Sequence, residues 1–203
     1  MSIAKRKELE KIEMHKRILD SARKIFLEKG YEHTSIRNIA SEISYSPGSI
    51  YFYFKDKNEI FHELHKEGFR LLLKQMKAAD VIDDPYERYK ELGLVFIRFA
   101  QHHTDYYNLM FLVSETGKVQ GEGFETAKET VEHLSGVIQQ CQDQGRFKGL
   151  DNKYMTFMTM SSVHGICSLY CKDRMSGFFQ KSGEEMMLHG YETFIALIDK
   201  SEG

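Results

Sequence analysis

Residues 15–61 read HKRILDSARKIFLEKGYEHTSIRNIASEISYSPGSIYFYFKDKNEIF. The stretch begins with an amphipathic helix, because its apolar residues return at helical spacing on one face. These residues are Ile18, Leu19, Ala22, Ile25 and Phe26. Gly30 is predicted to end the helix, since glycine adopts the positive φ of a helix C-terminus at little cost.

Two short helices are predicted next, joined by a tight break at Ser44-Tyr45. The first begins at Thr34 or Ser35, which are good N-cap residues. The second begins at Ser46-Pro47, an N-cap followed by a proline at the first helical position, and ends near Lys55. Helices this short build poor cores alone, but they are typical of a helix-turn-helix. There, one helix crosses the phosphate backbone and the other enters the major groove.

This stretch is similar to the DNA-binding domain of the TetR family. The family pattern is a helix ending in phenylalanine and a glycine-aromatic pair, then T-[ST]-[VI]-R-x-I-A and, after a turn, S-x-G-[TS]-[LI]-Y-x-[HY]-F-x-x-K. The matching positions are Phe26, Gly30, Tyr31, Thr34, Ser35, Ile36, Arg37, Ile39, Ala40, Ser46, Gly48, Ser49, Ile50, Tyr51, Tyr53, Phe54 and Lys57. Three positions depart from the pattern. Ser44 replaces the usual turn glycine, so it must avoid or accept the left-handed conformation. Tyr45 replaces a small aliphatic residue, and Pro47 replaces a common lysine.

The resemblance implies which side chains contact double-stranded operator DNA. Phosphate contacts are implied for Ser35, Tyr51, Tyr53 and Lys57, and base or groove contacts for Arg37, Pro47, Gly48, Ser49 and Phe52. We expect Arg37 to be the main base reader, because arginine pairs in bidentate fashion with guanine. Three alternatives stay open: Arg37 as a solvated surface residue, Tyr51 as packing between the first and third helices, and Phe52 as an exposed aromatic beside a thymine methyl.

The rest of the chain also has helical periodicity, which predicts an all-α fold of about nine helices. An N-terminal three-helix head is predicted over residues 1–57, followed by a helical ligand-binding and dimerisation domain over 58–203. The later helices are expected near residues 56–79, 85–103, from 104 onward, 125–144, 151–172 and 184–200. Gly117, Gly121 and Gly123 are expected to lie in a flexible connection.

The charge distribution supports a DNA-binding head. Residues 1–57 contain 12 Lys and Arg against 8 Asp and Glu, whereas the remainder contains 16 against 22. A basic head on an acidic body is expected of a nucleic-acid-binding protein. No apolar run reaches a membrane span, no secretory leader is visible, and three cysteines form no disulfide framework. These features predict a cytoplasmic protein without a membrane partner.

Other classes of function are less well supported. The sequence contains no glycine-rich phosphate loop, no metal triad of recognised spacing and no nucleophile elbow, so we expect no enzyme. A helical adaptor that binds only protein would not need a helix suited to the DNA groove. The favoured function is a transcriptional regulator, with repression favoured over activation by the resemblance.

The C-terminal region resembles a TetR subgroup with a W-x-x-x-H-G-type signature. His164 and Gly165 match it, although the chain has no tryptophan. The resemblance implies a small-molecule pocket inside the body and a homodimer through the last two long helices. Apolar walls with a few polar groups suit a largely apolar effector. The pocket residues expected are Phe96, Phe99, His103, Tyr107, Met110, Phe111, Met158, His164 and Cys167; each could also be ordinary core.

His164, Cys167 and Cys171 share one helical face. Both residue types bind metals, and two cysteines could form a redox switch. Three ligands on one helix rarely reach one ion, however, and no fourth is evident. We therefore expect no metal and no cofactor, with buried packing favoured for these residues.

Overall fold

A computed structural model describes residues 2–112, 122–174 and 177–201. Within these ranges the chain forms nine α-helices and no strand, so the all-α prediction is confirmed. The helices are α1 (Ile3–Lys29), α2 (Ile36–Glu42), α3 (Pro47–Ile50), α4 (Lys57–Lys77), α5 (Pro85–His102), α6 (Thr104–Tyr107), α7 (Glu122–Asp143), α8 (Asn152–Cys171) and α9 (Gly183–Ser201). A 3₁₀ turn, η1 (Ala78–Val81), follows α4, and a π-helical turn, η2 (Asn108–Leu112), follows α6.

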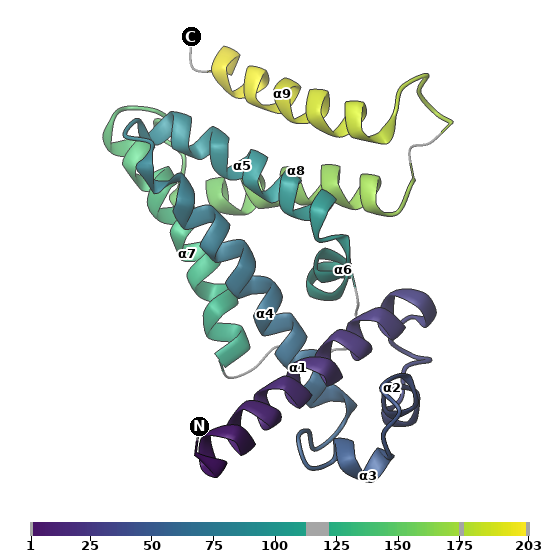
Figure 1. Cartoon of the computed structure of the whole chain (residues 1–203). Helices are drawn as coiled ribbons and strands as arrows, with labels where there is room; N and C mark the ends of the chain where they lie inside the picture. Colours follow the sequence, from purple (N-terminus) through teal and green to yellow (C-terminus); the bar gives the residue numbers. More distant parts are fainter. Residues whose placement is uncertain (1, 113–121, 175–176, 202–203) are drawn as a thin grey trace.

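The first three helices and the start of α4 form the head (Figure 1). The predicted stripe of α1 is buried there with Ile39 of α2 and Ile50 of α3. The side chains of Ser35, Ser46 and Asp56 accept hydrogen bonds from the first turns of α2, α3 and α4. Each cap satisfies a backbone N–H that the helix itself leaves unpaired. Local capping therefore fixes where the three helices begin.

Ser44 accepts the left-handed conformation, with φ 60°. Of the two alternatives for the turn between α2 and α3, avoiding or accepting this conformation at Ser44, the structure shows the second. A non-glycine residue pays a steric cost in this region, so the turn is strained at the position where the family usually has glycine.

The body is built on α4 and α7, which pack side by side, with α5 and α8 crossing one end and α9 lying outside them (Figure 1). The first turns of α4 belong to the core of the head, where Phe61 meets Phe26 and Tyr31 at ring separations of 5.5 and 4.7 Å. The predicted boundary at residue 57 therefore coincides with the first residue of a helix that both parts share. The boundary itself stays a prediction.

Two predicted elements differ from the structure. The third helix is predicted to reach Lys55, but α3 ends at Ile50 and residues 51–53 form a turn, in which Tyr53 N donates to Ile50 O at 2.9 Å. The seventh helix begins at Glu122 rather than 125, so Gly123 lies in a helix and not in a connection. Gly117 and Gly121 lie outside the described residues.

Among the described helices, none is both long enough and apolar enough to cross a membrane.

Candidate DNA-binding surface and effector cavity

The predicted base-contacting residues lie on an exposed surface around α2 and α3. Arg37 lies in α2 with its side chain exposed, while Pro47 and Gly48 are exposed in the first turn of α3 and Ser49 is half-buried. Phe52 is 90% exposed directly after α3. The Phe52 ring is therefore accessible to solvent and available for contact with a partner.

The predicted phosphate-contacting residues divide into two groups. Ser35 and Tyr51 are exposed, and at 57% exposure Tyr51 does not pack between α1 and α3 as the alternative supposed. Tyr53 and Lys57 are half-buried. Lys57 Nζ donates to the carbonyl oxygen of Tyr31 at 3.0 Å and lies 4.2 Å from the centre of its ring. Lys57 thus contributes to packing of the head as well as to its positive charge.

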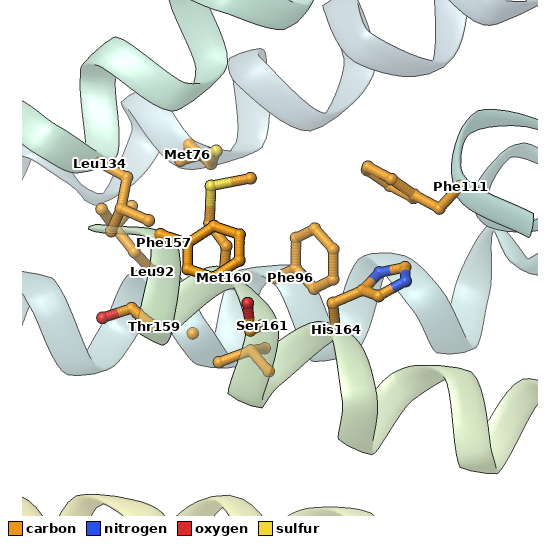
Figure 2. Close-up of a pocket in the computed structure, with 12 residues that line it drawn as sticks. Met76, Leu92, Phe96, Phe111, Leu134, Phe157, Thr159, Met160, Ser161 and His164 are labelled. Carbon is orange, nitrogen blue, oxygen red and sulfur yellow. The ribbon is translucent and has the colours of Figure 1, made fainter. Parts of the chain in front are cut away.

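A cavity of about 300 Å³ lies inside the body between α4, α5, α7 and α8 (Figure 2). Its wall is mostly apolar, with Thr159, Ser161 and His164 as the polar side chains. The full lining is Met76, Leu92, Gly93, Phe96, Phe111, Leu134, Phe157, Thr159, Met160, Ser161, Val163 and His164. Phe157 is 65% exposed, so the cavity opens to the surface beside α8. Its size and chemistry are those of a small-molecule site.

Three of the nine predicted pocket residues line this cavity: Phe96, Phe111 and His164. The others have different positions. Phe99, Tyr107, Met110 and Cys167 are buried in the core. His103 faces Gln75, with 3.4 Å between the two Nε2 atoms, and Met158 is exposed on α8. These six residues are close in sequence to residues that line the cavity, which is why the sequence predicts them there. They lie on other faces of their helices, because successive residues of a helix point in different directions.

The sequence reasoning missed several residues of the lining, including Met76, Leu92, Leu134, Phe157 and Met160. Helical spacing gave a partial signal. Leu92 lies four residues before Phe96, and Met160 lies four residues before His164, so each pair shares a face. Met76 and Leu134 gave no comparable signal, because their part in the wall depends on how α4 and α7 pack.

His164 is held by Tyr107 at the edge of the cavity. The Tyr107 hydroxyl lies 3.0 Å from Nδ1 of the ring and donates to the His164 backbone oxygen at 3.1 Å. Burial lowers the pKa of His164 and raises that of Tyr107. Both side chains are therefore neutral at physiological pH, and the Nε2 edge of the imidazole is left for a ligand.

The two cysteines of α8 have no reactive character. Burial raises the pKa of the Cys167 thiol to about 12 and that of Cys171 to about 11. A thiolate is the form that binds metal or exchanges with disulfides, so both groups are disfavoured for either role. Within the described residues, no three His, Cys, Asp or Glu side chains are grouped as metal ligands.

A helix-turn-helix head joined by a shared helix to an all-helical body with an internal cavity defines a class of protein, the DNA-binding transcriptional regulators. Two family patterns match the chain. "Bacterial regulatory proteins, tetR family" covers residues 18–64, and "Tetracyclin repressor-like, C-terminal domain" covers residues 89–194. The chain belongs to the TetR family and is a regulator rather than an enzyme. The subgroup suggested by His164 and Gly165 stays a prediction.

Curated relatives agree with this assignment. The chain is 24% identical over 158 residues to the probable acrEF/envCD operon repressor of Escherichia coli (strain K12), covering 70% of this chain and 69% of that one. It is 24% identical over 152 residues to the fatty acid metabolism regulator protein of Bacillus subtilis (strain 168), with coverage of 72% and 77%.

The fold also matches solved structures. The fatty acid degradation regulator FadR from Bacillus halodurans superposes with a TM-score of 0.72 at 17% identity, over 88% of this chain and 92% of that one. At this identity the likeness concerns the fold alone.

Proposed function

We propose that this regulator is a homodimeric, cytoplasmic repressor that a largely apolar small molecule releases from operator DNA. The cavity in the body is the observation that carries the proposal. Repression is favoured because a relative spanning most of the chain is named as an operon repressor. Cytoplasmic action follows from the proposed partner, since operator DNA is found there.

The cavity is connected to α4 through the segment formed by α6 and η2. Phe111 lines the cavity and packs against Phe69 of α4 with ring centres 5.6 Å apart. His65 Nε2 of α4 lies 3.2 Å from the Met110 carbonyl oxygen, and Tyr106 donates to Glu67 Oε2 at 2.9 Å. A ligand that displaces Phe111 would therefore also disturb the contacts that hold α4.

The same segment reaches the head directly. Arg23 Nε of α1 forms an ion pair with Asp105 Oδ2 at 3.3 Å, and its guanidinium lies 5.0 Å from the Tyr106 ring centre. Because the segment contacts both α1 and α4, occupancy of the cavity would alter the orientation of the head. The two heads of a dimer must match the spacing of two half-sites, so a change in orientation weakens operator binding.

The effector is expected to be a chain or ring compound with one polar group. Eight apolar side chains favour its body, while His164 Nε2 and the Ser161 hydroxyl can bind the polar end. Two similar proteins are named for fatty acid metabolism or degradation, which makes fatty acids the first ligands to test. A Met-containing wall adapts to flexible chains of this kind.

Dimerisation is proposed through α8 and α9. Several apolar side chains of these helices are exposed in the single chain: Tyr154, Phe157, Met158, Leu169 and Leu197. An exposed apolar surface of this extent is typical of a protein interface. Removal of residues 184–203 should leave a monomer or an aggregate that binds DNA poorly. A stable dimer after this truncation, measured by light scattering, would contradict the proposed interface.

The release mechanism can be tested with a variant that fills the cavity. Leu134 of α7 lines the cavity, whereas Val131, one turn earlier, is exposed and does not. The probe is a duplex from the upstream region of the regulator's own gene, titrated with fatty acids of increasing length. Leu134→Phe should bind the duplex but resist release, and the control Val131→Phe should be released like wild type. Equal release of both variants would contradict binding in this cavity.

A further inference from the structure

The first turns of α1 extend beyond the core of the head. No residue before Met14 packs against the core in the described chain, and Ile3 is 79% exposed. This extension is basic: residues 2–17 contain six Lys and Arg against three Glu. A helix that projects into solvent without an apolar partner contributes little to the core, so its charge pattern requires another explanation.

The extension has one face directed toward the recognition helix. Lys7, Lys11, Met14 and Ile18 follow at intervals of four, three and four residues, which places them on one face of α1. Ile18 is buried in the core of the head. Lys11 and Met14 line a surface concavity together with Tyr45, Ser46, Gly48, Ser49, Phe52 and Tyr53. Lys11 is therefore beside α3, and Lys7 lies one turn farther out, about 6 Å along the axis.

The two lysines of this face are unpaired. In the part of the head that the structure describes, Arg6 forms an ion pair with Glu10 at 2.8 Å and Lys24 one with Glu42 at 2.5 Å, while no carboxylate reaches Lys7 or Lys11. Like charges four residues apart also weaken the helix that carries them. An anionic partner that lies against α3 would remove this repulsion.

We propose that Lys7 and Lys11 bind two backbone phosphates beside the groove that α3 enters, and so extend the contact of each head with DNA. The proposal rests on the DNA-binding function of the head. DNA is favoured over an acidic protein segment because the concavity is shared with Gly48, Ser49 and Phe52, which face the groove. A protein bound there would block DNA.

The test compares two double variants of the full chain that lose the same charge. Lys7→Gln/Lys11→Gln alters the face beside α3. Lys5→Gln/Lys16→Gln alters the opposite face, where both lysines are exposed. Binding to a random-sequence duplex is measured by fluorescence anisotropy over a range of salt concentrations, so the operator need not be known. Circular dichroism checks that both variants remain folded.

The first variant should lower the slope of log affinity against log salt by about 1.8 per head, because each phosphate contact contributes about 0.9. If wild type and variant bind DNA equally at about 1 M salt, this difference in slope makes the affinity of the variant about 30-fold lower per head at about 0.15 M. The second variant should keep most of the wild-type slope. Equal slopes for the two variants, or an unchanged slope for the first, would overturn the proposal while leaving DNA binding intact. Failure of the wild type to bind any duplex would instead refute the function on which it rests.

Discussion

Gly93 of α5 is the position where a single added methyl group should disturb the body most. It lies directly under Tyr191 of α9, and an added Cβ would be 2.5 Å from Cε2 of the ring and closer still to Cζ and the hydroxyl oxygen. The ring cannot move freely. Tyr191 is 3% exposed, and its hydroxyl donates to the Lys90 carbonyl at 2.7 Å. Gly93→Ala must therefore displace a rigid, anchored side chain.

The expected cost follows from three contributions. Alanine in place of glycine favours a helix by about 1 kcal/mol. Overpacking of a filled core costs roughly 1–3 kcal/mol, and loss of the Tyr191–Lys90 hydrogen bond costs about 1 kcal/mol. Gly93→Ala should lower the free energy of unfolding by about 2 kcal/mol and the thermal midpoint by roughly 4–8 °C. Because the strain is at the α5–α9 contact, dimerisation should weaken as well.

A matched glycine provides the control. Gly136 lies in α7, and a Cβ there would meet nothing within 4 Å. Gly136→Ala should raise stability by about 0.5–1 kcal/mol. Urea unfolding measures both variants, and light scattering measures the dimer. Tyr191→Leu should rescue part of the loss in Gly93→Ala, since it removes the ring. Equal stability of Gly93→Ala and Gly136→Ala, or a strictly additive double variant, would refute the reasoning.

Four further substitutions test the head and its coupling to the body. Arg37→Ala should weaken the binding free energy for the operator by about 1–3 kcal/mol and that for random DNA only slightly; equal losses on both duplexes would exclude Arg37 as the base reader. Lys57→Ala should weaken binding to both duplexes. Because it also loses the contacts with Tyr31, it should lower the free energy of unfolding by about 1 kcal/mol. Gly68→Ala places a Cβ against Met110 Sδ and 3.1 Å from Cδ1 of the Tyr106 ring, so it should displace the α6–η2 segment from α4 and shift the effector concentration for half-release. An unshifted titration would rule out this coupling. Burial lowers the pKa of His65 from 6.5, so the unfolded chain binds the proton more readily and stability should fall as the pH drops below about 6.5. His65→Gln should flatten this dependence in urea titrations at several pH values; an unchanged slope would contradict it.

The head could be predicted from sequence because its signals are local. The caps Ser35, Ser46 and Asp56 each act on a backbone N–H three residues away, and the stripe of α1 repeats within one helix. The end of α3 could not be predicted in the same way. The aromatic run after Ile50 is compatible with a helix, but Phe54 is buried with its ring centre 4.5 Å from that of His15 in α1, a tertiary contact that local signals do not predict.

The cavity could be predicted only in part because its wall is tertiary. Periodicity states which residues share a face of α5 or α8, but not which neighbouring helix that face meets. Phe96 and Phe99 are separated by less than one turn, yet one lines the cavity and the other is fully buried in the core. Met76 enters the wall from a helix whose other end belongs to the head. No local sequence pattern predicts that Met76 of α4 lies beside the cavity residues of α5 and α8.

The order of contacts along α4 provides a route by which the proposed effector, bound in the cavity, would act on the distant DNA-binding surface. Lys57 begins the helix in the head, Gly68 lies against the α6–η2 segment, and Met76, in the last turn, lines the cavity. At 1.5 Å per residue, Met76 is about 12 Å and Lys57 about 16 Å from Gly68. If α4 turns as a rigid rod about this contact, a shift of about 1 Å at Met76 becomes about 1.4 Å in the opposite direction at Lys57. In the proposed dimer the mismatch between the two heads would double, while DNA keeps its half-sites at fixed helical spacing. In the proposed mechanism small displacements in the cavity would therefore be sufficient for release, because the head needs only to lose register with the groove.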